Sequence, residues 1–175
     1  RDEQPAIIFR PETGGSTELS YAELYRAVAR TAAALRAAGV EKGDRVAGFM
    51  PNLPETAIAM LAATSIGAIW SSCSPDFGID GVVERFGQIR PKVLFCAAAY
   101  TYNGKTFDCL DKVLGVVRSI DSIEHTVVVP YVNPDARLDR IPNAAWFGDF
   151  TDNEESEVEF EPLPFDHPVY IMYSS

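Results

Sequence analysis

Short apolar runs alternate along the chain with longer segments in which apolar residues recur every three or four positions. The first pattern predicts buried strands, and the second predicts amphipathic helices. The predicted strands cover residues 45–50, 68–72, 92–96, 126–129 and 169–173. The predicted helices cover residues 21–38, 55–66, 79–89 and 107–117. Strand and helix therefore follow one another in turn, which is typical of α/β domains.

The first predicted helix has a clear start signal. Ser20 followed by Glu23 is a capping-box pattern, in which each side chain satisfies a free backbone N–H group of the first turn. Before it, residues 5–9 and 19–21 flank a Gly-Gly-Ser turn and predict a β-hairpin. We therefore expect the chain to open with a hairpin that leads directly into a long helix.

The alternating pattern also predicts how the elements are arranged. It implies right-handed βαβ crossovers, and so a parallel sheet covered by helices on both faces. The predicted fold class is α/β, a parallel, doubly wound sheet layer with flanking helices, formed as a single unit by residues 1–175. Ligands bind such sheets beyond the carboxyl ends of the strands. That edge would hold Pro51–Asn52, Ser71–Phe77, Ala97–Lys105 and Tyr173–Ser175.

Residues 130–168 break this pattern and form a Pro-rich acidic connection. They contain six of the 12 prolines, and we expect them to be mostly loop. The formal net charge of the chain is −10, and eight of its 25 acidic residues lie within 149–166, where there is no Lys or Arg. The other 17 acidic residues face 15 basic ones, so the rest of the chain is nearly balanced. A solvated, charged loop explains the acidity, and the lack of a basic patch argues against nucleic-acid binding.

Composition narrows the class of protein further. The chain has 47% hydrophobic and 23% charged residues, which is ordinary for a globular protein. Its three cysteines include no Cys-x-x-Cys pair, and the two histidines stand at no metal-ligand spacing, so we expect no metal site and no disulfide framework. The uncharged stretch 56–75 is too polar at its end to span a membrane. A reduced, cytoplasmic location fits these features.

The glycine spacing excludes the common nucleotide-binding motifs. No two of the 12 glycines are two positions apart, which removes the dinucleotide fingerprint, and no Gly-x-x-x-x-Gly is followed by Lys. The Gly-x-Ser-x-Gly motif of esterases is also missing.

Several ordered segments carry a resemblance to a known family. They are Leu19-Ser20-Tyr21-Ala22-Glu23-Leu24, Gly39-Val40-x-x-Gly43-Asp44-Arg45-Val46, Pro51-Asn52-x-Pro54-Glu55, Ile66-Gly67-Ala68 and Tyr173-Ser174-Ser175. Together they resemble the N-terminal portion of the large domain of the adenylate-forming acyl-CoA synthetases. The runs Ser74-Pro75-Asp76-Phe77-Gly78, Arg85-Phe86-Gly87-Gln88-Ile89-x-Pro91 and Tyr100-x-Tyr102-Asn103-Gly104-Lys105 are most similar to the acetoacetyl-CoA synthetase branch.

The resemblance implies a two-step ligase. Acetoacetate and ATP with Mg²⁺ would give an acyl-adenylate and pyrophosphate, after which the CoA thiol would displace AMP. It also implies partners, namely the remainder of the large domain and a small C-terminal domain. Because the chain has no initiator Met and nothing like that C-terminal domain, we expect a fragment that is inactive alone and holds no catalytic residue.

The resemblance also implies site residues. Ser174 and Ser175 match the opening of the phosphate loop Tyr-Ser-Ser-Gly-Thr-Thr-Gly-x-Pro-Lys and would bind ATP phosphates, because hydroxyl and backbone N–H groups suit a polyphosphate. Two polar residues at a frayed chain end are the alternative. The candidates for CoA binding are Trp70, Ser71, Ser72, Tyr100, Tyr102 and Lys105.

Each CoA candidate also has a simpler interpretation. Acetyl-CoA synthetases carry two glycines where this chain has Ser71 and Ser72, and those glycines let the pantetheine arm of CoA approach the backbone. The two serines are larger than glycine but small enough to leave a channel. Trp70 could be a core aromatic residue. Lys105 offers one point charge where related enzymes have arginines, and it could belong to a plain Asn-Gly turn. Buried hydrophobic roles suit the cysteines better than nucleophilic ones.

Three further interpretations stay open, the last of them a purely structural α/β domain that binds neither ATP nor CoA. A ligase for acetate, propionate or another short acid would share most of these residues. A non-catalytic module that binds a nucleotide or CoA would share the fold without the reaction.

Overall fold

The computed structural model describes residues 2–173 and contains a five-stranded parallel sheet at its centre. The strands, listed in their order across the sheet, are β4 (Ile69–Cys73), β3 (Arg45–Phe49), β5 (Val93–Ala97), β8 (His125–Val129) and β9 (Ala144–Trp146). The chain runs outward from β3 to β4 and then returns to the other side of β3. The sheet therefore has a topological switch point between β3 and β5, where open α/β sheets bind ligands.

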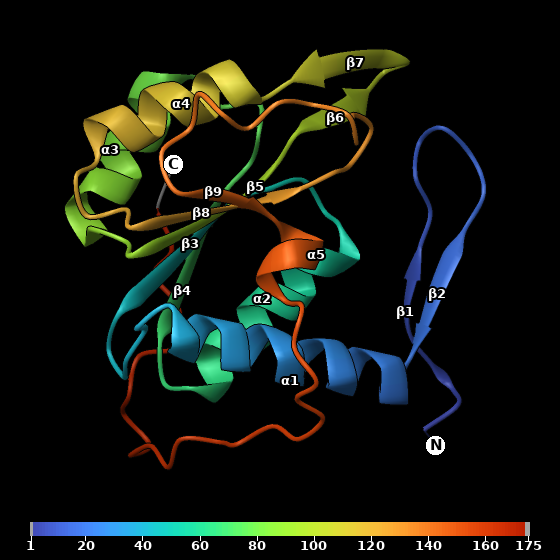
Figure 1. Cartoon of the computed structure of the whole chain (residues 1–175), viewed down its shortest axis with the longest axis vertical. Helices are drawn as coiled ribbons and strands as arrows, with labels where there is room; N and C mark the ends of the chain where they lie inside the picture. The colour runs from blue at the N-terminus through green and yellow to red at the C-terminus, as the bar shows by residue number, and fades with distance from the viewer. Residues whose placement is uncertain (1, 174–175) are drawn as a thin grey trace.

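Helices cover both faces of the sheet, as the sequence predicts (Figure 1). One face packs against α1 (Tyr21–Ala37), α2 (Pro54–Ser65) and the short α5 (Phe147–Phe150), and the other packs against α3 (Ile79–Ile89) and α4 (Leu110–Ser119). This confirms the doubly wound α/β fold. No helix within residues 2–173 is long and apolar enough to cross a membrane.

The two faces have separate cores. On the α1–α2 face, the fully buried ring of Phe95 lies 6.4 Å from the ring of Trp70 and 6.1 Å from that of Phe150, measured between centroids. The opposite core contains Phe49 and Phe86, which are also fully buried. Burial of this kind stabilises the sheet on both sides, and it leaves ligand binding to the strand ends.

Two hairpins stand at the periphery of the sheet. β1 (Pro5–Phe9) and β2 (Thr17–Ser20) form the predicted N-terminal hairpin, and the capping box of Ser20 and Glu23 starts α1. The second hairpin, β6 (Ala99–Tyr102) and β7 (Lys105–Asp108), was not predicted.

The prediction of a helix over 107–117 was therefore wrong at its start, because Phe107 lies in β7 and α4 begins at Leu110. Asn103 and Gly104 adopt φ angles of 49° and 70°, the backbone that a tight hairpin turn requires. The Asn-Gly turn in the sequence was a direct signal for this hairpin.

The connection 130–168 is mostly irregular, but it also forms β9 and α5, which sequence reasoning missed. Its acidic part does not project freely into solvent. Residues 153–161 run alongside α1 and α2. The guanidinium of Arg36 donates to the carbonyl of Glu159 (2.7 Å), and the Lys42 ammonium pairs with Glu161 (3.3 Å). The acidic segment is therefore docked by basic residues on the far side of α1 from β8 and β9 (Figure 1).

The predicted strand over 169–173 is present only as a short parallel bridge at the edge of the sheet. Tyr170 bridges to Trp70, whose backbone N–H donates to the carbonyl of Val169 (3.0 Å) and whose carbonyl accepts from Ile171 (2.9 Å). This segment extends the sheet beyond β4.

Candidate functional site

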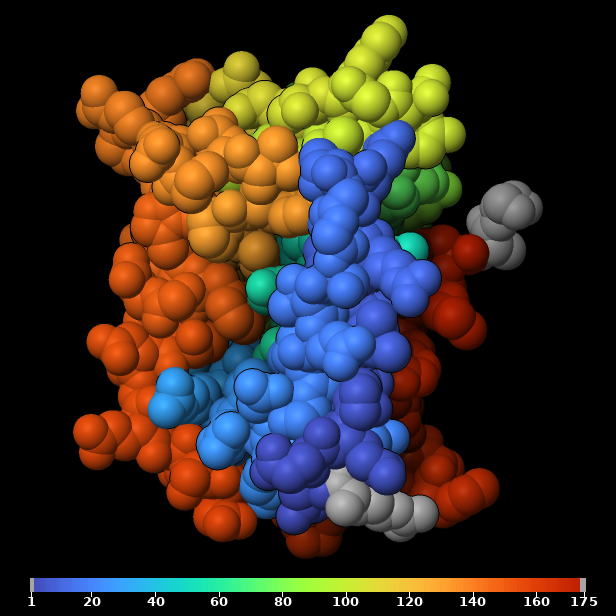
Figure 2. Space-filling view, turned by 90° about the vertical axis from the view of Figure 1, so that its right-hand side faces the viewer, coloured from blue at the N-terminus to red at the C-terminus, as the bar shows by residue number. Residues whose placement is uncertain are grey.

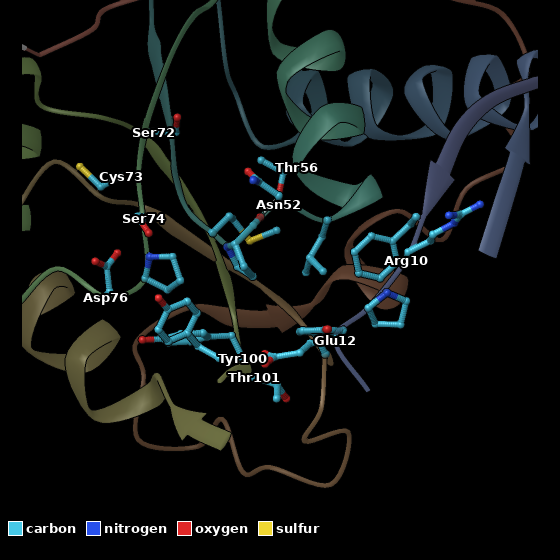
Figure 3. A pocket seen from close by; sticks show the side chains of 18 residues that line it. Arg10, Glu12, Asn52, Thr56, Ser72, Cys73, Ser74, Asp76, Tyr100 and Thr101 are labelled. Carbon is cyan, nitrogen blue, oxygen red and sulfur yellow. Dashed lines mark hydrogen bonds between the residues drawn. The ribbon is translucent and has the colours of Figure 1, made fainter. Parts of the chain in front are cut away.

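A cleft of about 590 Å³ opens at the carboxyl ends of the central strands, next to the topological switch point (Figure 3). We call it the switch-point cleft. Its walls come from the loops after β1, β3 and β4 and from β6, and they include Arg10, Glu12, Met50, Pro51, Asn52, Thr56, Ser72, Cys73, Ser74, Pro75, Asp76, Tyr100, Thr101 and Tyr102. Three of the four edge segments predicted from the sequence therefore meet at one cleft.

The loop after β4 forms one wall and is held from below by α4. The ammonium group of Lys112 donates to the carbonyl oxygens of Pro75 (2.9 Å) and Phe77 (3.3 Å). Two hydrogen bonds from one cation to backbone carbonyls restrict this turn, and Ser74 and Asp76 line the cleft from it. Lys112 is a supporting residue that the sequence did not reveal, because it lies 35 residues beyond the loop.

The β6–β7 hairpin forms the opposite wall. The ring of Tyr100 stacks on Phe107 at 5.2 Å and 20°, and burial raises the pKa of its hydroxyl, which stays protonated. Tyr102 lines the cleft and is 70% exposed, so its ring is available for stacking. Lys105 is exposed on β7 and lies outside the cleft lining.

The N-terminal hairpin closes one end of the cleft by reaching the β6–β7 turn. A carboxylate oxygen of Glu12 accepts a hydrogen bond from the backbone N–H of Gly104 at 3.0 Å. In Figure 2 the blue N-terminal segment meets the yellow-green residues of this hairpin. Sequence reasoning missed Glu12, because nothing in the pattern signals a contact across 92 positions.

A second cleft of about 500 Å³ lies on the other side of the end of β4. We call it the β4 cleft. It is lined by Met60, Trp70, Ser71, Phe77, Arg85, Ile171, Met172 and Tyr173, and it shares Ser72, Cys73 and Ser74 with the switch-point cleft. The end of β4 is therefore a common wall between a cleft at the switch point and one that reaches Tyr173.

The six CoA candidates divide according to this geometry. Ser72 is exposed and borders both clefts, whereas Tyr100 and Tyr102 line the first. The Ser71 hydroxyl is buried and donates to the carbonyl of Ile171 at 2.8 Å, so it ties the last segment to β4. Ser174 and Ser175 lie outside the described residues.

Trp70 is a core residue that also borders the β4 cleft. It is 4% exposed, and its ring packs so closely on β3 that a Cβ atom at Gly48 would lie 2.6 Å from it. Glycine at position 48 is therefore needed for this close approach.

The three thiols are buried, which disfavours their thiolate form. Cys73, Cys96 and Cys109 are buried and form no disulfide. Burial raises the pKa of all three thiols, and for Cys109 it raises the pKa to about 11. All three therefore stay protonated near neutral pH. Within residues 2–173, no group of three or more His, Cys, Asp or Glu side chains could hold a metal ion.

Comparison with known proteins gives consistent relatives. The acetoacetyl-CoA synthetase of Gallus gallus is 49% identical over 164 residues, which cover 90% of this chain and 25% of that protein. The acetoacetyl-coenzyme A synthetase of Rhizobium meliloti is 48% identical over 172 residues, covering 97% and 26%. The chain thus spans about a quarter of the length of these relatives.

A solved structure of one such enzyme has the same fold as this chain. The solved structure of the acetoacetyl-CoA synthetase from Streptomyces lividans superposes with a TM-score of 0.91 at 38% identity, covering 99% of this chain and 26% of that one. The profile of the AMP-binding enzymes matches residues 1–175. The chain belongs to the AMP-binding enzyme family.

Proposed function

We propose that the chain is part of an acid–CoA ligase that activates acetoacetate with ATP through an acyl-adenylate and then transfers it to CoA. The family and the two acetoacetyl-CoA synthetases that share nearly half of its residues support this activity. The observation that carries the proposal within the molecule is the shared wall at Ser72–Ser74, which places two clefts side by side at the ligand-binding edge of the sheet.

In this proposal CoA lies along that edge. Its adenine end occupies the region near the exposed ring of Tyr102, because a nucleobase gains from stacking on an aromatic face. Its pantetheine arm crosses the end of β4 at Ser72 and enters the β4 cleft. The thiol then approaches Tyr173, after which Ser174 and Ser175 begin the phosphate loop that holds ATP.

Charge on the cleft walls supports one direction for the phosphates. Glu12 and Asp76 line the switch-point cleft with Arg10 as the one cation, so its walls carry a net negative charge that would repel phosphate groups bound deep inside it. Lys105 is exposed on β7, pairs with Tyr102 across the β6–β7 hairpin and lies outside the cleft lining. We therefore place the phosphates outside, toward Lys105, and the uncharged pantetheine within the cleft.

The proposal assigns the remaining chemistry to other parts of the ligase. The rest of the large domain and the small C-terminal domain would supply the carboxylate pocket and the catalytic groups, and Mg²⁺ would arrive with ATP. The short chain alone is then inactive. A reducing compartment such as the cytoplasm suits an enzyme with three unpaired thiols.

Substrate preference tests the proposed reaction. ATP–pyrophosphate exchange by the parent ligase should be fastest with acetoacetate, compared with acetate and butyrate at equal concentration. Faster exchange with acetate would favour the short-acid alternative. No exchange with any of the three acids would contradict adenylate formation itself.

The isolated chain provides the second test. Residues 1–175 should support no ATP–pyrophosphate exchange, and turnover by them would contradict the assignment of catalysis to the rest of the ligase. Calorimetric titration of the same chain with CoA and with ATP separates the other class of function, because micromolar binding without turnover would favour a binding module.

A further inference from the structure

Arg85 lies on α3 with its guanidinium group between two aromatic rings. Its Cζ atom is 4.6 Å from the ring centroid of Phe77 and 5.8 Å from that of Tyr173. It forms no ion pair with a carboxylate of residues 2–173. An arginine that contacts aromatic faces and carries no ion pair has its planar surface committed to those rings.

The contact between α3 and Tyr173 is made twice. The Tyr173 hydroxyl donates to the backbone carbonyl of Arg85 at 3.0 Å, so this residue meets the tyrosine with both its side chain and its main chain. The guanidinium group is itself held in place, because Nη1 donates to the carbonyl of Gly81 one turn earlier (2.9 Å). The Arg85 side chain is thus held in place by contacts on both sides and can support Tyr173.

The last described segment is held to the rest of the chain by few contacts. Its pairing with β4 consists of the single bridge at Tyr170, supported by the Ser71 hydroxyl on Ile171. Met172 is 86% exposed and makes no core contact. Beyond Ile171, Tyr173 packs against the core of the α3–α4 face, and its ring and hydroxyl contact Arg85 of α3.

We propose that Arg85 is a positioning residue for ATP binding. By holding Tyr173 through its ring and its hydroxyl, it sets the place and direction from which the chain enters Ser174 and Ser175. This inference rests on the proposed function, in which those two residues open the loop around the ATP phosphates. Arg85 acts through Tyr173 and need not touch ATP.

Hydrogen exchange tests the structural half of the proposal without any assay of activity. In the parent ligase, Arg85→Met should speed exchange of the backbone amides in the peptide 169–173 by about tenfold, the size expected when cation–π contacts are lost. Arg85→Lys keeps the charge without the planar group and should give a smaller increase. Arg118→Met, which removes an exposed arginine from α4, is the matched control and should change nothing.

Kinetics of the first half-reaction tests the functional half. Arg85→Met should raise the KM for ATP by about tenfold and leave the KM for the carboxylic acid unchanged, with partial rescue in Arg85→Lys. Partial unfolding would lower kcat alone, because it reduces the amount of active enzyme. Tyr173→Phe keeps the ring, removes one hydrogen bond and should give a smaller rise in the same KM.

The outcomes are distinct. Unchanged exchange at 169–173 in Arg85→Met would overturn the proposal. Faster exchange with an unchanged KM for ATP would overturn the positioning role while leaving the ligase assignment intact. Faster exchange in a parent protein that forms no adenylate would support the role of Arg85 in holding Tyr173 and contradict the proposed function.

Discussion

The interior of the sheet and its carboxyl edge are built in different ways. In the interior, Val46, Val93 and Phe95 are fully buried in the core of the α1–α2 face, and Phe49 is fully buried in the core of the opposite face. At the edge, a few hydrogen bonds hold the loop after β4, the β6–β7 hairpin and the segment 169–173; Lys112 and Ser71 donate two of them, and Glu12 accepts the third.

The difference separates stability from binding. Interior contacts are numerous and apolar, so a change there alters the free energy of unfolding. Edge contacts are fewer and many are polar, and Glu12 and Ser71 line the two clefts. A change at the edge should therefore alter ligand binding with little effect on folding.

The largest expected effect is in the interior. Phe95→Ala removes a fully buried ring that contacts Trp70, Phe147 and Phe150. It should lower the free energy of unfolding by about 3–5 kcal/mol, measured by native-state hydrogen exchange of the β5 amides. Phe165→Ala is the control, because Phe165 is fully exposed and its loss should cost under about 0.5 kcal/mol. Equal effects at both positions would contradict the distinction.

A smaller loss is expected where β3 meets Trp70. Gly48→Ala places a Cβ atom 2.6 Å from the indole ring, which must move, and this should cost about 1–3 kcal/mol with a shift in tryptophan fluorescence. Gly87→Ala in α3 meets no atom within 4 Å and should instead stabilise the helix by about 0.5–1 kcal/mol. A stabilising Gly48→Ala would show that the contact with Trp70 is not required.

At the edge, the expected effect is on CoA. Tyr102→Ala should raise the KM for CoA by about tenfold through lost stacking on adenine, and leave the stability of β5 unchanged. Tyr102→Phe retains the ring and should behave like the unaltered protein. If both variants raise the KM equally, the hydroxyl rather than the ring makes the contact.

Alkylation of the cysteines compares the interior with the carboxyl edge of the sheet without any substitution. At pH 8 the raised pKa values keep the thiols protonated, so alkylation should be slow. The alkylation rate should increase with pH, and for Cys109 the increase should continue to a pH of about 11. Cys73 should react first because it borders both clefts, and desulfo-CoA at ten times its Kd, which adds no competing thiol, should slow the reaction by about tenfold. Protection of the interior Cys96 instead would contradict the placement of CoA.

The sequence predicts the interior well and the edge only in outline. The apolar runs that became β3, β5 and β8 are visible because burial on both faces demands them. Strand β9 has only three residues and forms by pairing with β8, so no local pattern marks it. The apolar spacing places Phe107 at the start of a helix, whereas the Asn-Gly turn before it indicates a hairpin.

The site shows the same limit. Ser72 could be placed from the rule that ligands bind beyond strand ends, and the resemblance to a family pointed to the same position. Glu12, Lys112 and Arg85 could not, because each acts on a segment far away in the sequence. Contacts of that kind exist only once the fold has formed.

The proposed path of CoA over the end of β4 is tested most directly by filling it. Ser72→Phe adds a ring at the wall between the two clefts, and Ser156→Phe adds the same ring on the exposed acidic segment as a control. In the parent ligase, Ser72→Phe should slow thioester formation by about a hundredfold while ATP–pyrophosphate exchange with acetoacetate stays within about twofold. Thioester formation at the unaltered rate, with an unchanged KM for CoA, would contradict this path.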